Sequence, residues 1–261
     1  PLASRHIALD NPAELWLIGD EPVPPYQRPP LSKKYMSGEL EKQRLFIRPL
    51  EWYSEQGITT HFGSRVVSIN RNRKQLESSS GEKFDYDKLV LCTGSSPRSL
   101  PKDIGGNLAG VYTLRNIADV EAMAPEFQPG RKLLIIGGGY IGLEAAAVAR
   151  KLGLEVTLLE MAGRILQRVA ARETSDFIRQ LHQKHGCDIR ESSQLGNLLE
   201  SSGRVIGAEL ADGEQIEANL VLVGIGALPN SELAEQAGLH CNNGIVVDDK
   251  CQTSDPHIFA A

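Results

Sequence analysis

The sequence lacks the cysteine groupings that would point to a metal centre or a disulfide framework. Its 261 residues contain four cysteines, none of them in a CxxC or CxxxxC spacing: Cys92, Cys187, Cys241 and Cys251. Structural zinc sites and small disulfide scaffolds need closer grouping, so neither is expected. We predict no metal site and four reduced thiols, as in a cytoplasmic protein.

Excess positive charge and a long apolar run are also missing. The 28 Lys and Arg residues are outnumbered by 33 Asp and Glu residues. Proteins that bind nucleic acids usually carry a basic face, so that class is not expected. The longest apolar stretch, residues 133–149, is interrupted by three consecutive glycines and by Glu144, and is too short and too rich in glycine to span a membrane. No cationic, apolar leader opens the sequence, so export is not expected either.

The sequence does contain an internal repeat. Residues 85–98 read DYDKLVLCTGSSPR and residues 217–230 read EANLVLVGIGALPN, which aligns Gly94 with Gly226 at an offset of 132 residues. A repeat of this size indicates two copies of one domain plan. A chain of this length is able to form two ordinary domains.

Short segments with alternating apolar residues and glycine turns precede both of these endings. The pattern is typical of a small β-meander that leads into a buried strand. The strands expected in the first copy are residues 66–69, 74–77, 83–86 and 88–92, and those in the second are residues 194–199, 205–210, 215–217 and 220–223.

The second copy begins with a strand–helix–strand unit. An apolar strand over residues 132–136, a glycine turn over 137–142, an alanine-rich helix over 143–152 and a strand over 155–159 follow one another. Such a βαβ unit implies a parallel sheet with helices on its faces.

The first copy begins differently, with a helix over residues 2–9 and a strand over residues 14–18 that ends at Gly19-Asp20-Glu21. Asp20 corresponds to Glu160 of the second copy. At the spacing of the second copy, the matching strand and glycine turn are expected to lie before residue 1. The sequence also ends on the apolar run Ile258–Ala261, so we expect both ends to be cut from a longer protein.

The glycine turn of the second copy matches the GxGxxG pattern of dinucleotide-binding domains. It reads GGGYIG, follows a predicted strand and opens a predicted helix. The glycines permit a tight turn and the close approach of a pyrophosphate, while the free N–H groups of the helix N-terminus favour an anion. The residues expected to contact a dinucleotide here are Gly137, Gly139, Tyr140, Ile141 and Gly142.

An acidic residue, Glu160, ends the next strand at the position that contacts the adenosine ribose in such domains. A carboxylate there accepts a hydrogen bond from the 2′-OH and repels a 2′-phosphate, so NADH is expected in preference to NADPH. Arg164 and Arg168 follow four residues apart and are able to reach the cofactor phosphates. For Arg164, a solvated basic side chain is an equally good interpretation.

Four motifs occur in a fixed order along the chain: YQRPPLSK at residues 26–33, LCTG at 91–94, GGGYIGLE at 137–144 and TSDPHIFA at 253–260. Together they resemble the FAD-dependent pyridine-nucleotide oxidoreductases, specifically their ferredoxin reductase branch. The resemblance covers the whole chain. In that family a first GxGxxG loop binds FAD, the last motif continues into a Gly-Asp pair, and a C-terminal interface domain follows. This sequence contains none of these three parts.

The resemblance implies cofactor roles for residues of both copies. The residues implied to contact FAD are Asp20, Arg28, Lys33, Val66, Thr93, Gly94 and Arg115. The residues implied to face NADH are Gly139, Ile141, Glu144, Glu160, Arg168 and Gly226.

Two of these residues, Lys33 and Glu144, are the predicted catalytic pair. The resemblance places both at the reactive face of the flavin, where an ammonium group would lie next to N5 and balance the negative charge that develops on reduction. We predict that they lie within salt-bridge distance or one water of it, with the lysine in the inter-domain cleft. The alternative is a surface lysine after a Pro-Pro turn and a first-turn glutamate favoured by the helix dipole.

The segment between residues 22 and 34 contains no cysteine, whereas the disulfide reductases of this superfamily carry one or two there. Electrons are therefore expected to leave the flavin directly. The function implied is electron transfer from NADH through FAD to a [2Fe-2S] ferredoxin or a rubredoxin that serves an oxygenase. The alternatives are an NADH oxidase or monodehydroascorbate-type reductase, and a non-enzymatic NADH-sensing flavoprotein like apoptosis-inducing factor.

The predicted fold class is α/β, with two Rossmann-like three-layer domains that each hold a parallel sheet and a β-meander. The FAD-binding domain is expected over residues 1–110 and 233–261, and the NAD-binding domain over residues 111–232. Trp16 and Cys92 are expected to be buried, and residues 71–74 to form a solvated turn. A monomer and a homodimer are both compatible with the sequence.

Overall fold

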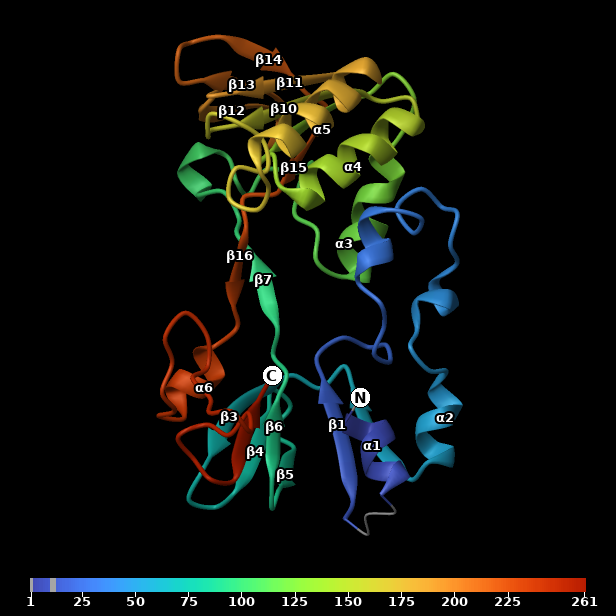
Figure 1. Cartoon of the computed structure of the whole chain (residues 1–261), viewed down its shortest axis with the longest axis vertical. Coiled ribbons are helices and arrows are strands. Elements are labelled where there is room, and N and C mark those ends of the chain that lie inside the picture. Colours follow the sequence, from blue (N-terminus) through green and yellow to red (C-terminus); the bar gives the residue numbers. More distant parts are fainter. Residues whose placement is uncertain (1, 10–12) are drawn as a thin grey trace. The chain divides into compact units, whose positions relative to one another are not determined.

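The computed structural model describes residues 2–9 and 13–261, so residue 1, where the predicted FAD-binding domain begins, lies outside the described part (Figure 1). The chain divides into two compact units. Unit 1 comprises residues 1–27, 43–95 and 228–261, and unit 2 comprises residues 28–42 and 96–227.

Unit 2 is built on a five-stranded parallel sheet with the strand order β11-β10-β9-β15-β8. All four residues of β15 are buried, as expected for a strand with both faces covered. The strands are β8 (Val111–Tyr112), β9 (Lys132–Ile136), β10 (Glu155–Glu160), β11 (Cys187–Glu191) and β15 (Leu220–Val223).

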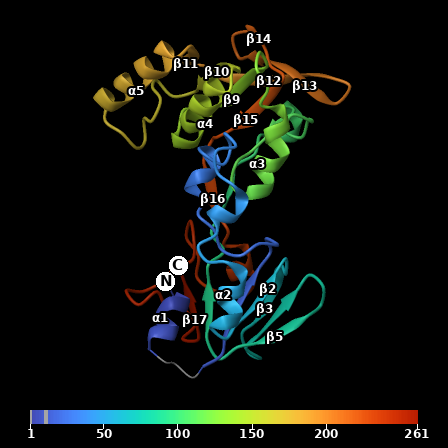
Figure 2. The ribbon, with the colours of Figure 1, turned by 90° about the vertical axis from the view of Figure 1, so that its right-hand side faces the viewer.

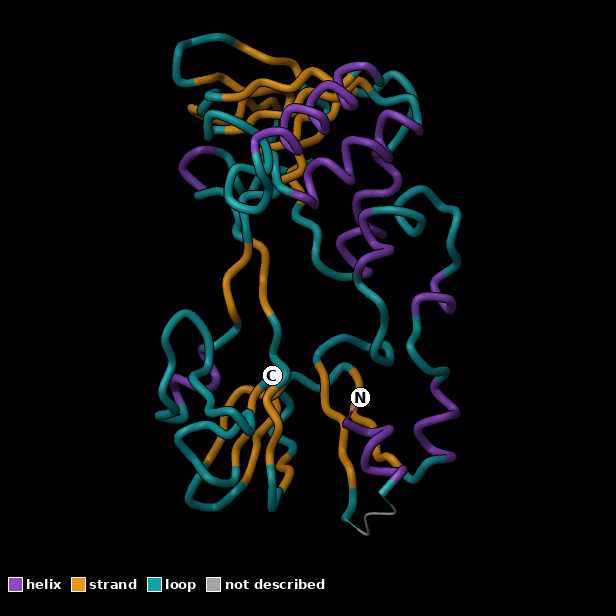
Figure 3. The backbone as a smooth tube through the Cα atoms, in the orientation of Figure 1, coloured by secondary structure: helices purple, strands orange, loops and turns teal. Residues whose placement is uncertain are grey.

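Helices α4 (Tyr140–Lys151) and α5 (Arg172–Lys184) connect β9 to β10 and β10 to β11. Figure 3 shows this alternation of strand and helix along the chain, and Figure 2 shows both helices on one side of the sheet. Three alanines of α4, Ala145, Ala146 and Ala149, are completely buried. Their small side chains allow the helix to lie close to the strands.

The opposite face of this sheet packs against an antiparallel meander formed by β12 (Leu195–Ser201), β13 (Arg204–Leu210) and β14 (Gln215–Glu217). Alternate residues of the sheet strands form one buried cluster with the meander, because successive side chains of a strand point to opposite faces. The sheet contributes Leu134, Ile136, Leu159, Val221 and Val223, and the meander contributes Leu198, Val205, Ala208, Leu210 and Ile216.

Unit 1 repeats these parts in an incomplete form. Two parallel pairs are present, β1 (Leu15–Gly19) with β2 (Ile58–Phe62), and β6 (Leu89–Leu91) with β17 (Ile258–Ala260). They correspond to the pairs β10–β11 and β15–β8 of unit 2. The meander is formed by β3 (Val66–Asn70), β4 (Gln75–Ser78) and β5 (Lys83–Asp85).

The described residues of unit 1 include no strand that corresponds to β9, the central strand of unit 2. Its sheet is therefore present as two separate pairs, whereas the sheet of unit 2 is continuous. The helices of unit 1 are short: α1 (Leu2–Ala8), α2 (Leu50–Glu55) and α6 (Glu232–Gln236). None of the helices in the described part of the chain has the length and apolar character needed to span a lipid bilayer.

The remaining elements are short. Strands β7 (Ser95–Pro97) and β16 (Ala227–Pro229) pair where the chain passes between the units, and α3 (Ile117–Met123) begins at a capping box formed by Asn116 and Asp119. The 3₁₀ helices are η1 (Pro29–Ser32), η2 (Lys42–Leu45), η3 (Lys102–Ile104) and η4 (Ala124–Glu126).

The α/β fold class with two Rossmann-like parts and two meanders is confirmed. The compact units divide after residues 95 and 227, and residues 28–42 are grouped with unit 2. The boundaries of the cofactor-binding domains at residues 110 and 232 stay a prediction. Trp16 was expected in the core, and this was wrong. It is 44% exposed, and its ring is stacked on His61 and meets the edge of the buried Phe84 of β5, so it borders the core without being enclosed by it.

The predicted solvated turn at residues 71–74 is wrong for Arg71. Its guanidinium donates to Asp255 Oδ2 at 2.7 Å and to the carbonyl oxygens of Ala237 and Gly238. Asp255 is only 8% exposed, and its Oδ1 also accepts a hydrogen bond from the His257 N–H. Arg71 thus links the meander of unit 1 to the loop that leads into β17.

This link predicts a pH-dependent contribution to stability. Burial by itself raises the pKa of Asp255, but the Arg71 hydrogen bond, the His257 N–H and the Arg71 charge outweigh it and hold the pKa below its ordinary value. The stabilisation is therefore complete above the ordinary aspartate pKa of about 4 and is lost as the pH falls through the lower pKa of the folded protein. We expect Asp255→Asn to reduce the free energy of unfolding by about 1–3 kcal/mol at pH 7.

Urea unfolding of the two proteins between pH 7 and pH 3 measures this difference, which should shrink toward pH 3. The exposed Asp249, changed to Asn, is the matched control. Equal urea midpoints for Asp255→Asn and Asp249→Asn at pH 7 would show that the link contributes nothing.

Candidate functional site

The glycine turn at residues 137–142 joins the carboxyl end of β9 to helix α4, and its backbone is tightly packed. Gly137 has a φ of +111°, and a Cβ atom at this position would lie 2.4 Å from the carbonyl oxygen of Gly224. A Cβ atom at Gly142 would lie 2.2 Å from the carbonyl oxygen of Gly137. Side chains at these two positions are therefore excluded by backbone atoms.

Gly139 differs from these two glycines, because no atom lies within 4 Å of the position that its Cβ would take. It is the N-cap of α4, so the free N–H groups of the first helical turn and the positive end of the helix dipole lie next to this open space. Tyr140 and Ile141, in the same turn, are 57% and 42% exposed. The turn thus offers a cradle for an anionic group, with exposed apolar side chains beside it.

Glu160 ends β10 with its carboxylate fixed by two backbone groups. Oε2 accepts a hydrogen bond from the Gly138 N–H and Oε1 accepts one from the Ala162 N–H, both at 2.7 Å. Each carboxylate oxygen has room for a further hydrogen bond. Glu160 is therefore held beside the glycine turn and still able to accept from a ligand hydroxyl.

Arg168 and Arg164 have different environments. Arg168 is exposed, and its guanidinium lies near Gly226, 3.8 Å from the position of an added Cβ there. Arg164 donates to the Ser175 hydroxyl and to the carbonyl oxygens of Gln167 and Ala170. Neither interpretation offered for Arg164, phosphate contact or solvated side chain, fits these bonds to its own protein.

Lys33 and Glu144 form the predicted ion pair. Lys33 Nζ lies 2.6 Å from Glu144 Oε2, and the two side chains are 47% and 31% exposed. The same Oε2 accepts a hydrogen bond of 2.5 Å from the buried Ser32 hydroxyl, and Lys33 Nζ also donates to the Pro29 carbonyl oxygen. All four residues belong to unit 2. Ser32 was not among the predicted site residues, and its place directly before Lys33 in the motif is the one signal that could have found it.

The segment that carries Lys33, residues 28–42, is fastened to unit 2 by further polar contacts. Arg28 donates to the Arg115 carbonyl oxygen at 2.8 Å. Glu121 on α3 accepts from the Tyr35 hydroxyl and from Lys42, each at 3.0 Å. Burial, together with the hydrogen bond to Glu121 and its charge, raises the pKa of Tyr35 to about 12, so this hydroxyl remains a donor at all ordinary pH values. A further ion pair joins Glu39 to Lys151.

Four of the predicted site residues lie in unit 1. Asp20 is exposed directly after β1, and Val66 opens β3. Thr93 and Gly94 follow β6 and bond to Asn230: the Thr93 hydroxyl donates to its carbonyl oxygen at 2.6 Å, and its backbone N–H donates to the Gly94 carbonyl oxygen at 2.9 Å.

The expected burial of Cys92 is wrong. This cysteine is exposed, because it comes after the last residue of β6, where the chain leaves the sheet.

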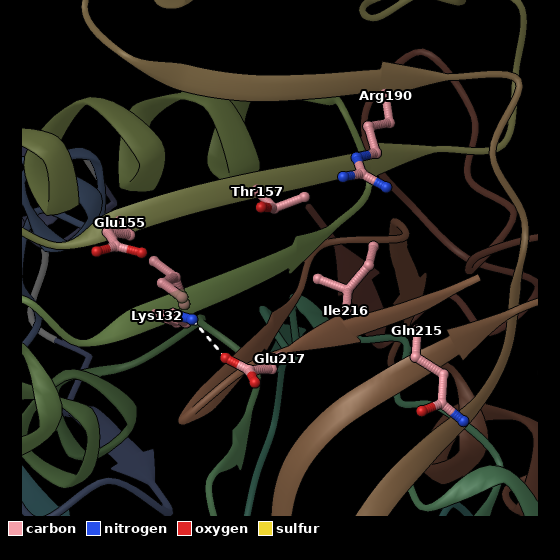
Figure 4. A pocket seen from close by; sticks show the side chains of 8 residues that line it. Lys132, Glu155, Thr157, Arg190, Gln215, Ile216 and Glu217 are labelled. Atoms are coloured by element: carbon pink, nitrogen blue, oxygen red, sulfur yellow. Dashed lines mark hydrogen bonds and ion pairs between the residues drawn. The ribbon is translucent and has the colours of Figure 1, made fainter.

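A separate cavity of about 270 Å³ lies at the amino ends of β9 and β10, away from the glycine turn (Figure 4). Three of the four charged residues that line it, all but Glu155, are held in ion pairs: Lys132 with Glu217 at 2.5 Å, and Arg190 with Glu214 at 2.7 Å. In doubly wound sheets, ligands bind at the carboxyl ends of the strands. The glycine turn, at the carboxyl end of β9, is therefore a better candidate site than this cavity.

The chain is similar to known proteins over nearly its whole length. The sequence pattern of the family described as "Pyridine nucleotide-disulphide oxidoreductase" matches residues 3–261. Putidaredoxin reductase CamA of Pseudomonas putida is 42% identical over 268 residues, which cover 99% of this chain and 64% of that protein. Ferredoxin–NAD(P)(+) reductase fdr of a Sphingomonas species is 42% identical over 244 residues, with coverages of 94% and 59%.

Among solved structures, the covalent putidaredoxin reductase–putidaredoxin complex is similar with a TM-score of 0.94 and 40% identity, and the match covers 99% of this chain and 63% of that one. The chain spans about three fifths of the length of the curated relatives named above.

The glycine geometry predicts effects of different size for two alanine substitutions. Gly142→Ala gains helix propensity but places a methyl group against the Gly137 carbonyl oxygen, so we expect a loss of about 1–3 kcal/mol in the free energy of unfolding. Gly139→Ala meets no atom, so its only cost is that alanine is a poorer N-cap than glycine, and we expect a loss of less than about 1 kcal/mol. Thermal unfolding of the two variants distinguishes these outcomes. A larger loss for Gly139→Ala than for Gly142→Ala would contradict the described packing.

Proposed function

Because the chain belongs to the pyridine nucleotide-disulphide oxidoreductase family, we propose that the whole protein is an FAD-dependent NADH:ferredoxin oxidoreductase. It passes electrons from NADH through FAD to a small iron–sulfur acceptor, a [2Fe-2S] ferredoxin or a rubredoxin, that serves an oxygenase. The observation that carries the proposal is the open cradle at Gly139 with the fixed Glu160 carboxylate beside it. The acceptor is proposed from the relatives, which are reductases of such carriers by name.

The residues of the glycine turn fit an NADH molecule. Gly139 leaves space for the pyrophosphate at the N-terminus of α4, and Gly137 and Gly142 keep the turn in the required conformation. Glu160 would accept the hydrogen bond of the ribose 2′-OH, and the exposed Arg168 beside Gly226 would neutralise phosphate charge. Tyr140 and Ile141 would cover the cofactor from the first turn of the helix.

For FAD, the fit of the described residues is partial. Asp20 stands at the strand end equivalent to Glu160 and would accept from the adenosine ribose. Val66, Thr93 and Gly94 would line the rest of that site in unit 1, and Arg28, Lys33 and Arg115 would approach the flavin. The described residues include no glycine turn equivalent to residues 137–142. When bound, FAD supplies a two-electron acceptor for NADH and a one-electron donor for the iron–sulfur protein.

Lys33 and Glu144 are the proposed catalytic pair. The ammonium group of Lys33 is held by Glu144 and by the Pro29 carbonyl oxygen, yet almost half of the side chain is exposed. A fixed positive charge stabilises negative charge that develops nearby during reduction. Glu144 is held by the Ser32 hydroxyl independently of Lys33, so the carboxylate keeps its place if the ammonium group moves.

The acceptor distinguishes this proposal from its rivals. An NADH oxidase would transfer electrons to O₂, a monodehydroascorbate-type reductase to an organic radical, and an NADH-sensing flavoprotein would turn over slowly with every acceptor. Turnover of the full-length protein with NADH, measured with a [2Fe-2S] ferredoxin, a rubredoxin, O₂ and a disulfide, decides among them. We further propose a cytoplasmic location, since the four cysteines form no disulfide.

Glu160 predicts the choice of nicotinamide cofactor. Contact between its carboxylate and a 2′-phosphate brings like charges together, which costs several kcal/mol, so the full-length enzyme should prefer NADH by about 100-fold in kcat/KM. Glu160→Gln removes the repulsion and should lower the preference at least about tenfold, mainly by improving NADPH. Steady-state kinetics with both cofactors measure this ratio. Equal kcat/KM values for the unaltered enzyme would refute the assigned role.

Lys33 predicts a selective effect on flavin reduction. Lys33→Met should slow reduction by NADH about 10- to 100-fold at saturating NADH, while the Kd for NADH changes far less, because the charge matters most in the transition state. Stopped-flow absorbance of the full-length flavoprotein measures both quantities. The neighbouring exposed Lys34, changed to Met, is the control. A reduction rate for Lys33→Met that equals that of Lys34→Met would leave Lys33 without a catalytic role.

A further inference from the structure

Arg164 lies in the loop between β10 and α5, residues 161–171. Its guanidinium group donates hydrogen bonds to the backbone of that loop and to α5. Its Nη1 donates to the Ser175 hydroxyl at 2.5 Å, and its Nη2 donates to the carbonyl oxygens of Gln167 and Ala170 at 3.2 and 3.0 Å. A planar guanidinium group supplies such divergent donors in a fixed geometry, which an ammonium group does not. The three bonds connect both halves of the loop to helix α5.

Ser175 completes this network from inside the protein. It is completely buried on α5, and its hydroxyl accepts from Arg164 while it donates to the Ile165 carbonyl oxygen at 2.8 Å. Both hydrogen-bonding functions of a buried hydroxyl are thus occupied. Because Ser175 has no exposed surface, it does not touch a bound ligand directly.

A second anchor holds the same loop from the carboxyl end of β11. Glu191 Oε1 accepts from the Ile165 N–H at 2.9 Å, and its Oε2 is paired with Arg179 Nη1 at 2.7 Å. Ile165 is therefore fixed at both its N–H and its carbonyl oxygen, by side chains from two different elements.

The fixed part of the loop lies directly against the glycine turn. The Leu166 N–H donates to the Gly138 carbonyl oxygen at 2.9 Å, and Leu166 adopts a left-handed conformation with φ of 54°. The side chain of Ile165 fills the space beside Gly138, where an added Cβ would lie 2.6 Å from it. The N–H of Ala162, in the same loop, holds Glu160 Oε1.

We propose that Arg164 and Ser175 are positioning residues that set the preference for NADH over NADPH and the affinity for NADH. They act through the loop over residues 161–171. Their hydrogen bonds hold the loop so that the Ala162 N–H donates to the Glu160 carboxylate and Arg168 lies exposed beside Gly226. This inference rests on the proposed function, since it takes the dinucleotide as the ligand of the glycine turn. It assigns to Arg164 a role distinct from phosphate binding, because both terminal nitrogens of the guanidinium group already donate to acceptors of the protein.

The decisive variant is Ser175→Ala, which removes a hydroxyl group that lies away from any ligand. In the full-length flavoprotein we expect the KM for NADH to rise about tenfold, as for other small displacements of a binding group. The ratio of kcat/KM for NADH to that for NADPH should fall about fivefold or more, and flavin reduction at saturating NADH should stay within about twofold. Arg164→Lys should give the same pattern, because an ammonium group does not satisfy three divergent acceptors.

Matched controls separate positioning from general damage. Thr174→Ala and Arg172→Lys change exposed neighbours of the network. Both variants should leave the KM for NADH and the ratio of the two kcat/KM values unchanged. The double variant of Arg164 and Ser175 should be little worse than either single variant, since both act through one network. Flavin content and Tm of each variant report on folding.

Three results overturn the inference. An unchanged cofactor ratio in Ser175→Ala with a lowered Tm would make the network merely structural. A large effect of Arg164→Lys alone, with Ser175→Ala unaffected, would make Arg164 a direct ligand. Additive effects in the double variant would exclude a shared network. Failure of the proposed function is a separate result, because the unaltered protein would then not bind NADH in a calorimetric titration.

Discussion

The close approach of helix α4 to the turn before it is the constraint on which the arrangement of unit 2 depends. With no side chain at Gly142, the first turn of the helix lies against the Gly137 carbonyl oxygen. The turn is then near enough to β10 for the Gly138 N–H to reach Glu160, and near enough to the following loop for Leu166 to reach the Gly138 carbonyl oxygen. One backbone contact therefore determines how two strand ends and a loop meet.

Helices α3 and α4 also organise the segment over residues 28–42. Two carboxylates do this, Glu121 on α3 and Glu144 on α4, and each accepts from two donors of the segment. Partly exposed ion pairs contribute little one at a time. Here a hydroxyl and an ammonium group both donate to each carboxylate. The position of residues 28–42 is therefore determined by the geometry of these bonds more than by the strength of any single ion pair.

Much of this arrangement was predictable from sequence, because it depends on local patterns. Period-two alternation identified the strands of both meanders, and the glycine spacing identified the turn before α4 and the acidic end of β10. The Lys33–Glu144 ion pair followed from motif resemblance. What stayed hidden depends on side-chain contacts between different elements: Arg71 with Asp255, and Arg164 with Ser175. From sequence alone, a charged side chain is predicted to be solvated, because the partner that the fold places beside it is not known. The predicted burial of Trp16 and Cys92 was wrong for a related reason. A strand pattern does not show how completely the neighbouring elements cover each residue of the strand or its end.

The fastening of residues 28–42 to unit 2 has a consequence for how this architecture can be recombined. In chain order the segment belongs to the first copy of the repeat, yet its ion pairs and hydrogen bonds are made to helices of the second. A cassette cut at residues 96 and 227 would leave Glu121 and Glu144 without their donors. Chimeras between homologues therefore need to exchange residues 28–42 together with residues 96–227. Substitutions in α3 or α4 are constrained by a segment that lies more than fifty residues earlier in the chain.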